Sequence, residues 1–372
     1  MSQIRVARLV IAGEPLVLGV ADKPTPGPND VLVKVAAAGL VPNAYSIITA
    51  VGAPVPTLPA VFGLDVSGVI EAVGENVLIL KAGDRVYVDP HMTCGTCTSC
   101  RRGREDICRY NSLRGYVALT PEGGELLNQN PLGGLSEYVI APDTRIAKLP
   151  DTVDLRTAAR LGYIGTSYAG LKKAGVGAGK TVLINGVTGT LGLAAVAIAL
   201  GMGATTILGI GRNRDVMRRI EQLAPDRIST RSSEDNIDLV AWVQESTGGD
   251  GVDALFDCLG NGGDSNSTNT LLAAITKGGR AVLAAGGVDG QISQSYWDIL
   301  TRDVAVVGSQ WFTSTEIDEL ITLIGAGVID LSFLEHRSYP LDEVNDAFAF
   351  VGDRPGGFVN VVVHPGDTAT DV

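Results

Sequence analysis

Apolar and polar positions follow different patterns in the two halves of the chain. In the first half, short β-type segments such as Val31–Ala36, Ser67–Val73 and Arg85–Val88 are separated by glycine, proline and asparagine. Regular helical periodicity is scarce there, and the stretch Asn111–Leu135 is expected to be a loop because turn residues are frequent in it. This half is therefore expected to consist mainly of short strands and turns.

From about residue 160, apolar β-type runs alternate with helical stretches. Each strand candidate is followed by a helix candidate: Thr181–Asn185 by Leu191–Leu200, Thr205–Ile210 by Asp215–Leu223, Val252–Cys258 by Thr268–Ile275, and Arg280–Ala285 by Ser295–Thr301. Continuous apolar strands between helices predict a parallel sheet covered on both faces, which is a doubly wound α/β domain. Ile317–Ile324 is a further helix candidate, and the mixed C-terminal segment ends in the strand-like Phe358–Val363.

Composition limits the classes of protein to consider. The 372 residues suffice for two domains, and 45% hydrophobic with 19% charged residues supports a substantial core. The net charge of −12 argues against a nucleic acid or a membrane surface as partner and favours a small-molecule substrate. Because no apolar run is long enough to cross a bilayer and the N-terminus lacks a secretory signal, we expect a cytoplasmic protein.

Four of the five cysteines lie close together, at Cys94, Cys97, Cys100 and Cys108. In a reducing compartment, clustered thiols indicate metal ligands or redox groups rather than disulfides. Four thiolates match the tetrahedral preference of Zn²⁺ and leave no position for water or substrate. The spacing therefore predicts one structural zinc per chain, with incidental buried cysteines or an iron–sulfur cluster as alternatives. Cys258, in a predicted strand, is expected to be a small core residue.

A glycine-rich turn follows the strand candidate Thr181–Asn185. In order, its residues are Gly186, Val187, Thr188, Gly189, Thr190, Leu191 and Gly192. A strand, glycines at three-residue steps and a helix together allow backbone amides to approach a pyrophosphate. This context favours a dinucleotide site over ordinary turn glycines.

The next strand candidate indicates which dinucleotide binds. NAD-binding proteins usually offer an acidic residue to the ribose hydroxyls about 20 residues after the glycines. Here Gly211, Arg212 and Arg214 stand at this point, without a carboxylate. Gly211 leaves room for a phosphate, and both arginines are candidates to pair with it, so we predict NADP(H). Two solvated arginines at a helix start are the alternative. Leu259 and Gly286, which follow two later strands, complete the expected cofactor contacts.

Together these motifs resemble the medium-chain dehydrogenase/reductase superfamily, in its zinc-containing alcohol dehydrogenase branch. The resemblance covers essentially the whole chain and includes Ala38-Gly39, Gly63-x-Asp65-x-x-Gly68, Gly83-Asp84-Arg85-Val86 and Thr166-Ser-Tyr168 in the family order. It implies three parts: a GroES-like, partly β-barrel catalytic domain over residues 1–162 with a zinc lobe at about 91–110, a Rossmann domain over 163–308, and a return segment over 309–372 that completes the catalytic domain. It also implies an active site between the domains, and a homodimer or homotetramer.

The chain departs from this family at the catalytic metal. Zinc-dependent members carry their three ligands at positions that correspond to Val41, Leu64 and Gly162. Valine and leucine cannot bind zinc, glycine has no side chain, and the chain has only three histidines as substitutes. We therefore predict an NADPH-dependent oxidoreductase that reduces a conjugated carbonyl, a quinone or an iminium without catalytic zinc.

Few catalytic candidates remain, and each has a structural alternative. Asn43 occupies the place of the family's proton-relay residue and is a candidate donor to an oxyanion, with Tyr45 nearby. His91, just before the cysteines, is a candidate proton donor. Asp65 is expected to act mainly as a hydrogen-bonded structural carboxylate, and Thr166 matches the family threonine that packs against the nicotinamide.

Two other functions stay open at this point. One is an alcohol dehydrogenase that reduces aldehydes or ketones, either without metal or through a rearranged site that uses Asp65 and His91. The other is a catalytically silent NADPH-binding protein. Trp311 and Phe312 are expected in the pocket wall or in a subunit interface.

Overall fold

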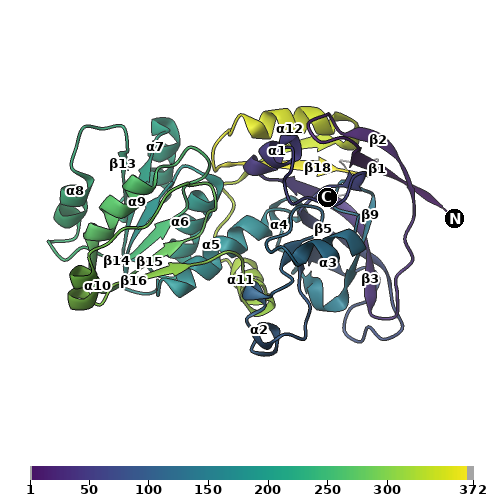
Figure 1. The fold of residues 1–372 in the computed structure, drawn as a ribbon, viewed down its shortest axis with the longest axis horizontal. Coiled ribbons are helices and arrows are strands. Elements are labelled where there is room, and N and C mark those ends of the chain that lie inside the picture. Colours follow the sequence, from purple (N-terminus) through teal and green to yellow (C-terminus); the bar gives the residue numbers. More distant parts are fainter. Residues whose placement is uncertain (1, 367–372) are drawn as a thin grey trace.

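The computed structural model describes residues 2–366 and arranges them in two lobes, with helix α5 (Leu161–Lys173) between them (Figure 1). The N-terminal and C-terminal parts of the chain share one lobe, and the middle of the chain forms the other. The expected boundary at residue 162 stays a prediction, because α5 runs across it without a break. Within residues 2–366, no helix combines the length and hydropathy needed to span a membrane.

The lobe that holds both chain ends is built on a mainly antiparallel sheet with strand order β10-β6-β5-β3-β18-β17, and β9 also pairs with β3. The strands are β3 (Asp30–Leu40), β5 (Asp65–Val73), β6 (Arg85–Val88), β9 (Tyr138–Pro142), β10 (Ile146–Lys148), β17 (Glu335–Pro340) and β18 (Val359–His364). Val363 of β18 lies opposite Ala38 of β3. The C-terminal strands therefore complete the sheet that the N-terminal half begins.

Smaller elements surround this sheet. They are a second sheet of β1 (Gln3–Leu9), β2 (Val17–Asp22) and β4 (Ala60–Val61), the ladder of β7 (His91–Met92) and β8 (Ser112–Leu113), and the helices α1 (Pro42–Thr49), α2 (Thr98–Arg101), α3 (Gly123–Gln129), α4 (Leu155–Ala158), α11 (Ser314–Gly325) and α12 (Val344–Gly352).

The prediction of a loop over Asn111–Leu135 is wrong in part, because this stretch contains β8 and α3. Paired glycines concealed the helix. A Cβ on Gly123 would lie 2.2 Å from the carbonyl oxygen of Asn111, so this glycine serves close packing rather than a turn. Leu127, 1% exposed, anchors the helix in the lobe.

The other lobe is the predicted doubly wound α/β domain. Its parallel sheet has the order β13-β12-β11-β14-β15-β16. The strands are β11 (Thr181–Asn185), β12 (Thr206–Gly211), β13 (Ile228–Ser232), β14 (Val252–Asp257), β15 (Ile275–Leu283) and β16 (Ala305–Gly308), and the helices are α6 (Thr190–Gly201), α7 (Arg214–Leu223), α8 (Leu239–Ser246), α9 (Ser265–Leu271) and α10 (Tyr296–Arg302). Val182 and Ile184 belong to one buried cluster and Leu183 to another, so β11 is covered on both faces.

One helix boundary in this lobe was wrong. The predicted helix Thr268–Ile275 ends at Leu271, and Ile275 instead opens β15, where it pairs with Val252. Apolar spacing alone does not separate a helix end from the start of a buried strand.

Candidate functional site

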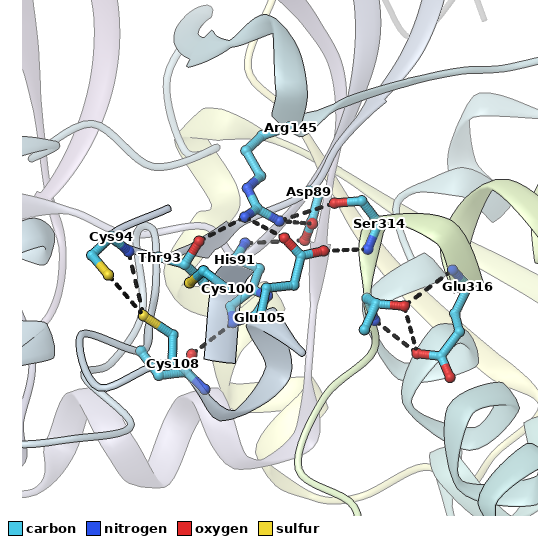
Figure 2. Close-up of polar contacts among 12 residues, drawn as sticks. Asp89, His91, Thr93, Cys94, Cys100, Glu105, Cys108, Arg145, Ser314 and Glu316 are labelled. Carbon is cyan, nitrogen blue, oxygen red and sulfur yellow. Dashed lines mark hydrogen bonds and ion pairs between the residues drawn. The ribbon is translucent and has the colours of Figure 1, made fainter. Parts of the chain in front are cut away.

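The four clustered cysteines converge on one point beside α2. Figure 2 shows three of them, Cys94, Cys100 and Cys108. Their sulfur atoms all lie within 4.8 Å of one another, and three Sγ–Sγ distances, 94–108, 97–100 and 97–108, are 3.6, 3.6 and 3.9 Å. Four sulfurs at ~2.3 Å from a tetrahedral zinc are separated by about 3.8 Å, so the cluster fits this metal. Backbone amides support the thiolates: the Cys94 N–H donates to Cys108 Sγ, and the Cys100 amide leads the hydrogen bonds that lower the pKa of Cys97 to about 6.

Arg145 connects the cysteine-containing segment of about residues 91–110, called the cysteine lobe from here on, to α11 (Figure 2). Its guanidinium donates to Glu105 Oε2 at 2.7 Å and to Ser314 Oγ at 3.1 Å, and it forms an ion pair with Asp89 at 3.4 Å. Glu105 in turn accepts the amide of Ser314 at 2.5 Å, at the start of α11. This cation, with its side chain 11% exposed, therefore has two carboxylate partners, and it fixes the lobe to the rest of the protein.

His91 is completely buried beside this network. Its Nε2 lies 2.7 Å from Asn111 Oδ1, an acceptor, so Nε2 carries the proton and Nδ1 is a bare acceptor without a partner among the described residues. Burial lowers the pKa of His91. A neutral, buried imidazole of this kind is better suited to a structural role than to the proton donation that the sequence suggested.

Asp65 lies at the start of β5, completely buried. Its Oδ1 accepts the Tyr87 hydroxyl at 2.8 Å and the Gly162 amide at 2.9 Å, whereas Oδ2 has no partner among the described residues. Burial raises the pKa of Asp65 to about 7. A Cβ on Gly162 would lie 2.3 Å from Oδ1, so the carboxylate occupies the space that a side chain at this position would need.

Two tyrosines that the sequence did not single out lie near Asp65. The Tyr163 hydroxyl donates to Asn43 Oδ1, and burial raises the pKa of Tyr163 above its usual range. Tyr116 is buried, and its hydroxyl has no partner among the described residues. Burial is the main cause that raises the pKa of Tyr116, and the charges of Tyr163 and Asp65 raise it further. Asn43 is thus joined to a phenol, and the side chain of Tyr45 lies outside the described part of the structure.

The glycine turn connects β11 to α6 as predicted. Gly186 has a φ of +95°, which favours glycine, and a Cβ on Gly192 would lie 2.3 Å from the Gly186 carbonyl oxygen. Gly189 is the exposed N-cap of α6, and no side chain caps the helix there. Free amides at Thr190 and Leu191 therefore face outward at the positive end of α6, which is the arrangement an anionic diphosphate requires.

At the end of β12, the two candidate arginines differ. Gly211 is buried, and a Cβ on it would lie 2.6 Å from the Thr188 side chain. Arg214 is already paired with Asp235 at 2.6 Å. Arg212 is exposed and forms no hydrogen bond or ion pair with the described residues. Of the two, Arg212 is therefore the group available to a ligand phosphate.

The remaining expected cofactor contacts come from three other segments of the chain. Thr166 is buried in α5, and its hydroxyl donates to the Gly162 carbonyl oxygen at 2.8 Å. Leu259 follows β14, where its amide donates to Asp257 at 3.3 Å, and a Cβ on Gly286 would meet nothing within 4 Å. Cys258 is buried beside the glycine turn, with its Sγ 3.2 Å from the Asn185 carbonyl oxygen, as expected for a core residue.

The C-terminal segment also reaches the glycine turn, which the sequence did not indicate. The Gly357 amide donates to the Thr188 carbonyl oxygen at 3.0 Å, and a Cβ on Gly357 would lie 2.6 Å from the Gly189 carbonyl oxygen. The buried Arg160, just before α5, donates to the carbonyl oxygens of Gly357 and Val359 at 2.6 and 2.9 Å. One arginine thus holds the segment that packs on the dinucleotide turn.

Comparison with known proteins identifies the architecture. A model of the alcohol dehydrogenase GroES-like domain matches residues 27–151, and a model of the zinc-binding dehydrogenase domain matches residues 190–326. An NAD-dependent alcohol dehydrogenase from Sulfolobus acidocaldarius is 30% identical over 282 residues, which cover 74% of this chain and 76% of that protein. The chain belongs to the medium-chain dehydrogenase/reductase superfamily. Like other members, it is an NAD(P)-dependent oxidoreductase.

Other members of the superfamily differ in their reactions. A quinone oxidoreductase from Sus scrofa is 30% identical over 335 residues, covering 88% of this chain and 86% of that protein. A structure from Sinorhizobium meliloti, described as a zinc-binding dehydrogenase bound to NADP, has a TM-score of 0.82 and 26% identity, and covers 98% of this chain and 100% of that one. Superfamily membership therefore establishes the oxidoreductase class but leaves the acceptor open.

Proposed function

We propose that this superfamily member is an NADPH-dependent reductase of activated acceptors, namely conjugated carbonyls, quinones or iminium ions, and that it works without a catalytic zinc. The observation that carries the proposal is the set of residues around the buried Asp65, called the Asp65 pocket below. Val41 and Leu64 are buried apolar residues, and Gly162 offers only its amide, which donates to Asp65. Among the described residues, the cysteines at 94, 97, 100 and 108 form the one cluster with the ligand set for a metal ion.

A bound NADPH would supply the hydride. The chain's own contribution begins with the α6 amides and the turn at Gly186, which suit the diphosphate. Without ligands for a Lewis acid, charge that develops on the acceptor oxygen must be stabilised by hydrogen bonds. We propose that the Tyr116 hydroxyl is such a donor, since it is buried and has no partner among the described residues, whereas the Tyr163 hydroxyl already donates its one proton to Asn43. An activated acceptor suits such donors because its enolate-type charge is already delocalised.

NADPH is proposed rather than NADH because Arg212 is exposed and forms no ion pair or hydrogen bond with the described residues. The NADP-bound structural relative supports this choice, whereas the name of the Sulfolobus relative indicates NAD. Arg212→Ala should weaken NADPH binding by roughly 10- to 100-fold, as for a lost charge-assisted hydrogen bond, and leave NADH binding nearly unchanged. Arg214→Ala is the matched control with a smaller effect, because Asp235 already holds that arginine. Equal losses for both cofactors would refute the assignment.

A homodimer through β16 is part of the proposal. β16 ends the parallel sheet, and Val306 on it is 37% exposed. The neighbouring α10 exposes Tyr296, Trp297 and Leu300 by 82, 67 and 59%. An unpaired strand edge beside large exposed apolar side chains is a typical subunit interface. Trp297→Glu should convert the dimer to a monomer in light-scattering measurements, and a wild-type monomer would contradict the proposal.

Metal and acceptor analysis tests the reaction. We expect one zinc per chain, and NADPH oxidation by a conjugated enone but not by the corresponding saturated ketone. Two zinc ions per chain with reduction of saturated ketones would instead establish the alcohol dehydrogenase reaction that the Sulfolobus relative's name indicates. Cofactor binding without turnover of any acceptor would indicate a silent binder.

A further inference from the structure

In the described part of the structure, most of the buried polar groups that lack a partner belong to the part of the chain between His91 and Tyr116. Among the described residues, the buried side-chain nitrogen and oxygen atoms that lack a hydrogen-bond partner belong to Asp65, His91, Ser112, Arg114, Tyr116 and Trp311. Folded proteins leave few such groups, and each needs a physical explanation. His91 and Ser112 lie on the β7–β8 ladder, Arg114 and Tyr116 follow it closely in the chain, and Trp311 comes after Gln310, which accepts a hydrogen bond from Asn111. This grouping indicates a site that a polar ligand completes.

Hydrogen bonds and ring contacts place these groups beside the proposed active site. The Gly63 amide donates to the Gly115 carbonyl oxygen at 3.1 Å, so the segment 112–116 runs next to the residues that lead into Asp65. On the other side, Gln310 accepts from Asn111 at 3.5 Å, and the Trp311 ring stacks on Phe312. The Phe312 ring fills the space beside Gly165, one residue before Thr166. The segment therefore lies between the Asp65 pocket and the nicotinamide side of α5.

Arg114 is the most anomalous of the six. It is 4% exposed, and both Nε and Nη1 are buried without a partner. Burial lowers the pKa of Arg114 only to about 10, so the guanidinium stays charged at neutral pH. The carboxylates of Asp89 and Asp30 attract the Arg114 guanidinium electrostatically, but neither forms an ion pair with it. By contrast, the half-buried Arg145 has carboxylate partners and the buried Arg160 has carbonyl partners.

A buried cation without a counter-charge is strongly destabilising, and a bound anion removes that penalty. Two neighbouring unpartnered groups suit an anion's oxygens, since Trp311 Nε1 is a pure donor and the Ser112 hydroxyl can donate. One cation balances one negative charge, which a carboxylate carries, whereas a phosphate monoester carries about −1.5 to −2 at neutral pH.

We propose that Arg114 recognises a carboxylate on the acceptor, so that the preferred substrate of this reductase is an activated acceptor with an acid group. The inference rests on the proposed function and names the substrate class for the same site. Arg114 is a specificity-determining residue in it. The hydride acceptor and the carboxylate are different ends of one molecule.

The test compares matched acceptors: 4-phenylbut-3-en-2-one with a para-carboxylate or a para-carboxamide on its ring. In the wild type, kcat/KM for the carboxylate should exceed that for the carboxamide by roughly 10- to 100-fold, the range for a charge-assisted contact. Arg114→Met should abolish this ratio and Arg114→Lys should restore part of it. Arg218→Met is the control, because Arg218 is exposed and pairs only with the exposed Asp215. A ratio near one in the wild type, or an unchanged ratio in Arg114→Met, would overturn the proposal.

A second measurement does not depend on the reaction. The carboxylate, but not the carboxamide, should raise the urea midpoint of wild-type unfolding in the presence of NADP⁺, and should do so less in Arg114→Met. Without ligand, the Arg114→Met midpoint should be no lower than that of the wild type, since the change removes an uncompensated charge. A lower midpoint together with no carboxylate effect would show a structural arginine. If the enones are not reduced but 4-formylbenzoate is preferred over 4-formylbenzamide, the proposed reaction fails and the role of Arg114 stands.

Discussion

The cysteine lobe and the Asp65 pocket occupy the two places where zinc-dependent relatives are expected to bind metal, and they differ in every physical respect. In the lobe, four sulfurs gather within 4.8 Å of one another and backbone amides support them. In the pocket, one buried carboxylate is held by Tyr87 and the Gly162 amide, among apolar neighbours. The first arrangement stabilises a divalent cation, whereas the second penalises even a single negative charge. Under the proposed function, the chain keeps the structural metal site of its fold and lacks the catalytic one.

The largest expected effect tests the lobe. Cys100→Ser should reduce the zinc content from one ion per chain to nearly none, because structural zinc sites gain about 10–16 kcal/mol from a complete ligand set and a missing thiolate removes much of it. The variant should also unfold at lower temperature. Metal analysis and calorimetry measure both. Cys258→Ser is the control, since Cys258 lies at the glycine turn, and it should keep its zinc. Unchanged zinc in Cys100→Ser would refute the four-sulfur site.

The second effect concerns the charge of Asp65. Burial raises its pKa from 3.8 to about 7, so between these values the folded protein holds a proton that the unfolded chain releases. The contribution of Asp65 to the free energy of unfolding is therefore largest at low pH. It falls by roughly 1.4 kcal/mol per pH unit between pH ~4 and ~7 and is constant at higher pH. Asp65→Asn removes this dependence. In urea unfolding, the free energy of unfolding of the variant should rise relative to that of the wild type by up to roughly 4 kcal/mol between pH 4 and 8.

Asp346→Asn, at an exposed position in α12, is the matched control and should show no such pH-dependent difference. A constant difference between Asp65→Asn and the wild type across this pH range would mean that the Asp65 carboxylate is ionised in the folded protein at every pH tested. A cation in the pocket would produce that result, and the contrast with the lobe would then be wrong.

The same two regions show what a sequence can predict. All four cysteine ligands lie within one short segment, so their spacing alone indicated a single site. The glycines before α6 also lie within a few residues of one another, so the dinucleotide turn could be predicted in the same way. The pocket joins residues that are 97 and 120 positions apart, as in the Asp65–Gly162 and Asn43–Tyr163 contacts. No local pattern marks Tyr163 or Arg114. Their roles depend on which groups tertiary packing leaves partnered, and that is decided by the fold.

A smaller effect tests the packing of the pocket. The Cβ added by Gly162→Ala would lie 2.3 Å from Asp65 Oδ1, so the change should cost about 1–3 kcal/mol of unfolding free energy. In an Asp65→Ser background the shorter side chain leaves room for the added Cβ. The loss of unfolding free energy caused by Gly162→Ala should then be smaller than in the wild type, so the effects of the two changes are not additive. Gly177→Ala is the control, because a Cβ there meets nothing within 4 Å. Additive effects would show that Asp65 does not fill this space.

The smallest expected effect is on catalysis. Replacing zinc by Co²⁺ should yield one cobalt per chain with the absorption of a tetrahedral thiolate site, because the cysteine cluster is where the described residues offer a complete ligand set. The turnover number should stay essentially unchanged, since the lobe reaches the rest of the protein through Arg145 and Ser314 rather than through reacting atoms. A metal that polarised the acceptor would alter turnover when exchanged. A marked change in turnover with a single bound cobalt would place the metal in the reaction and erase the distinction between the two regions.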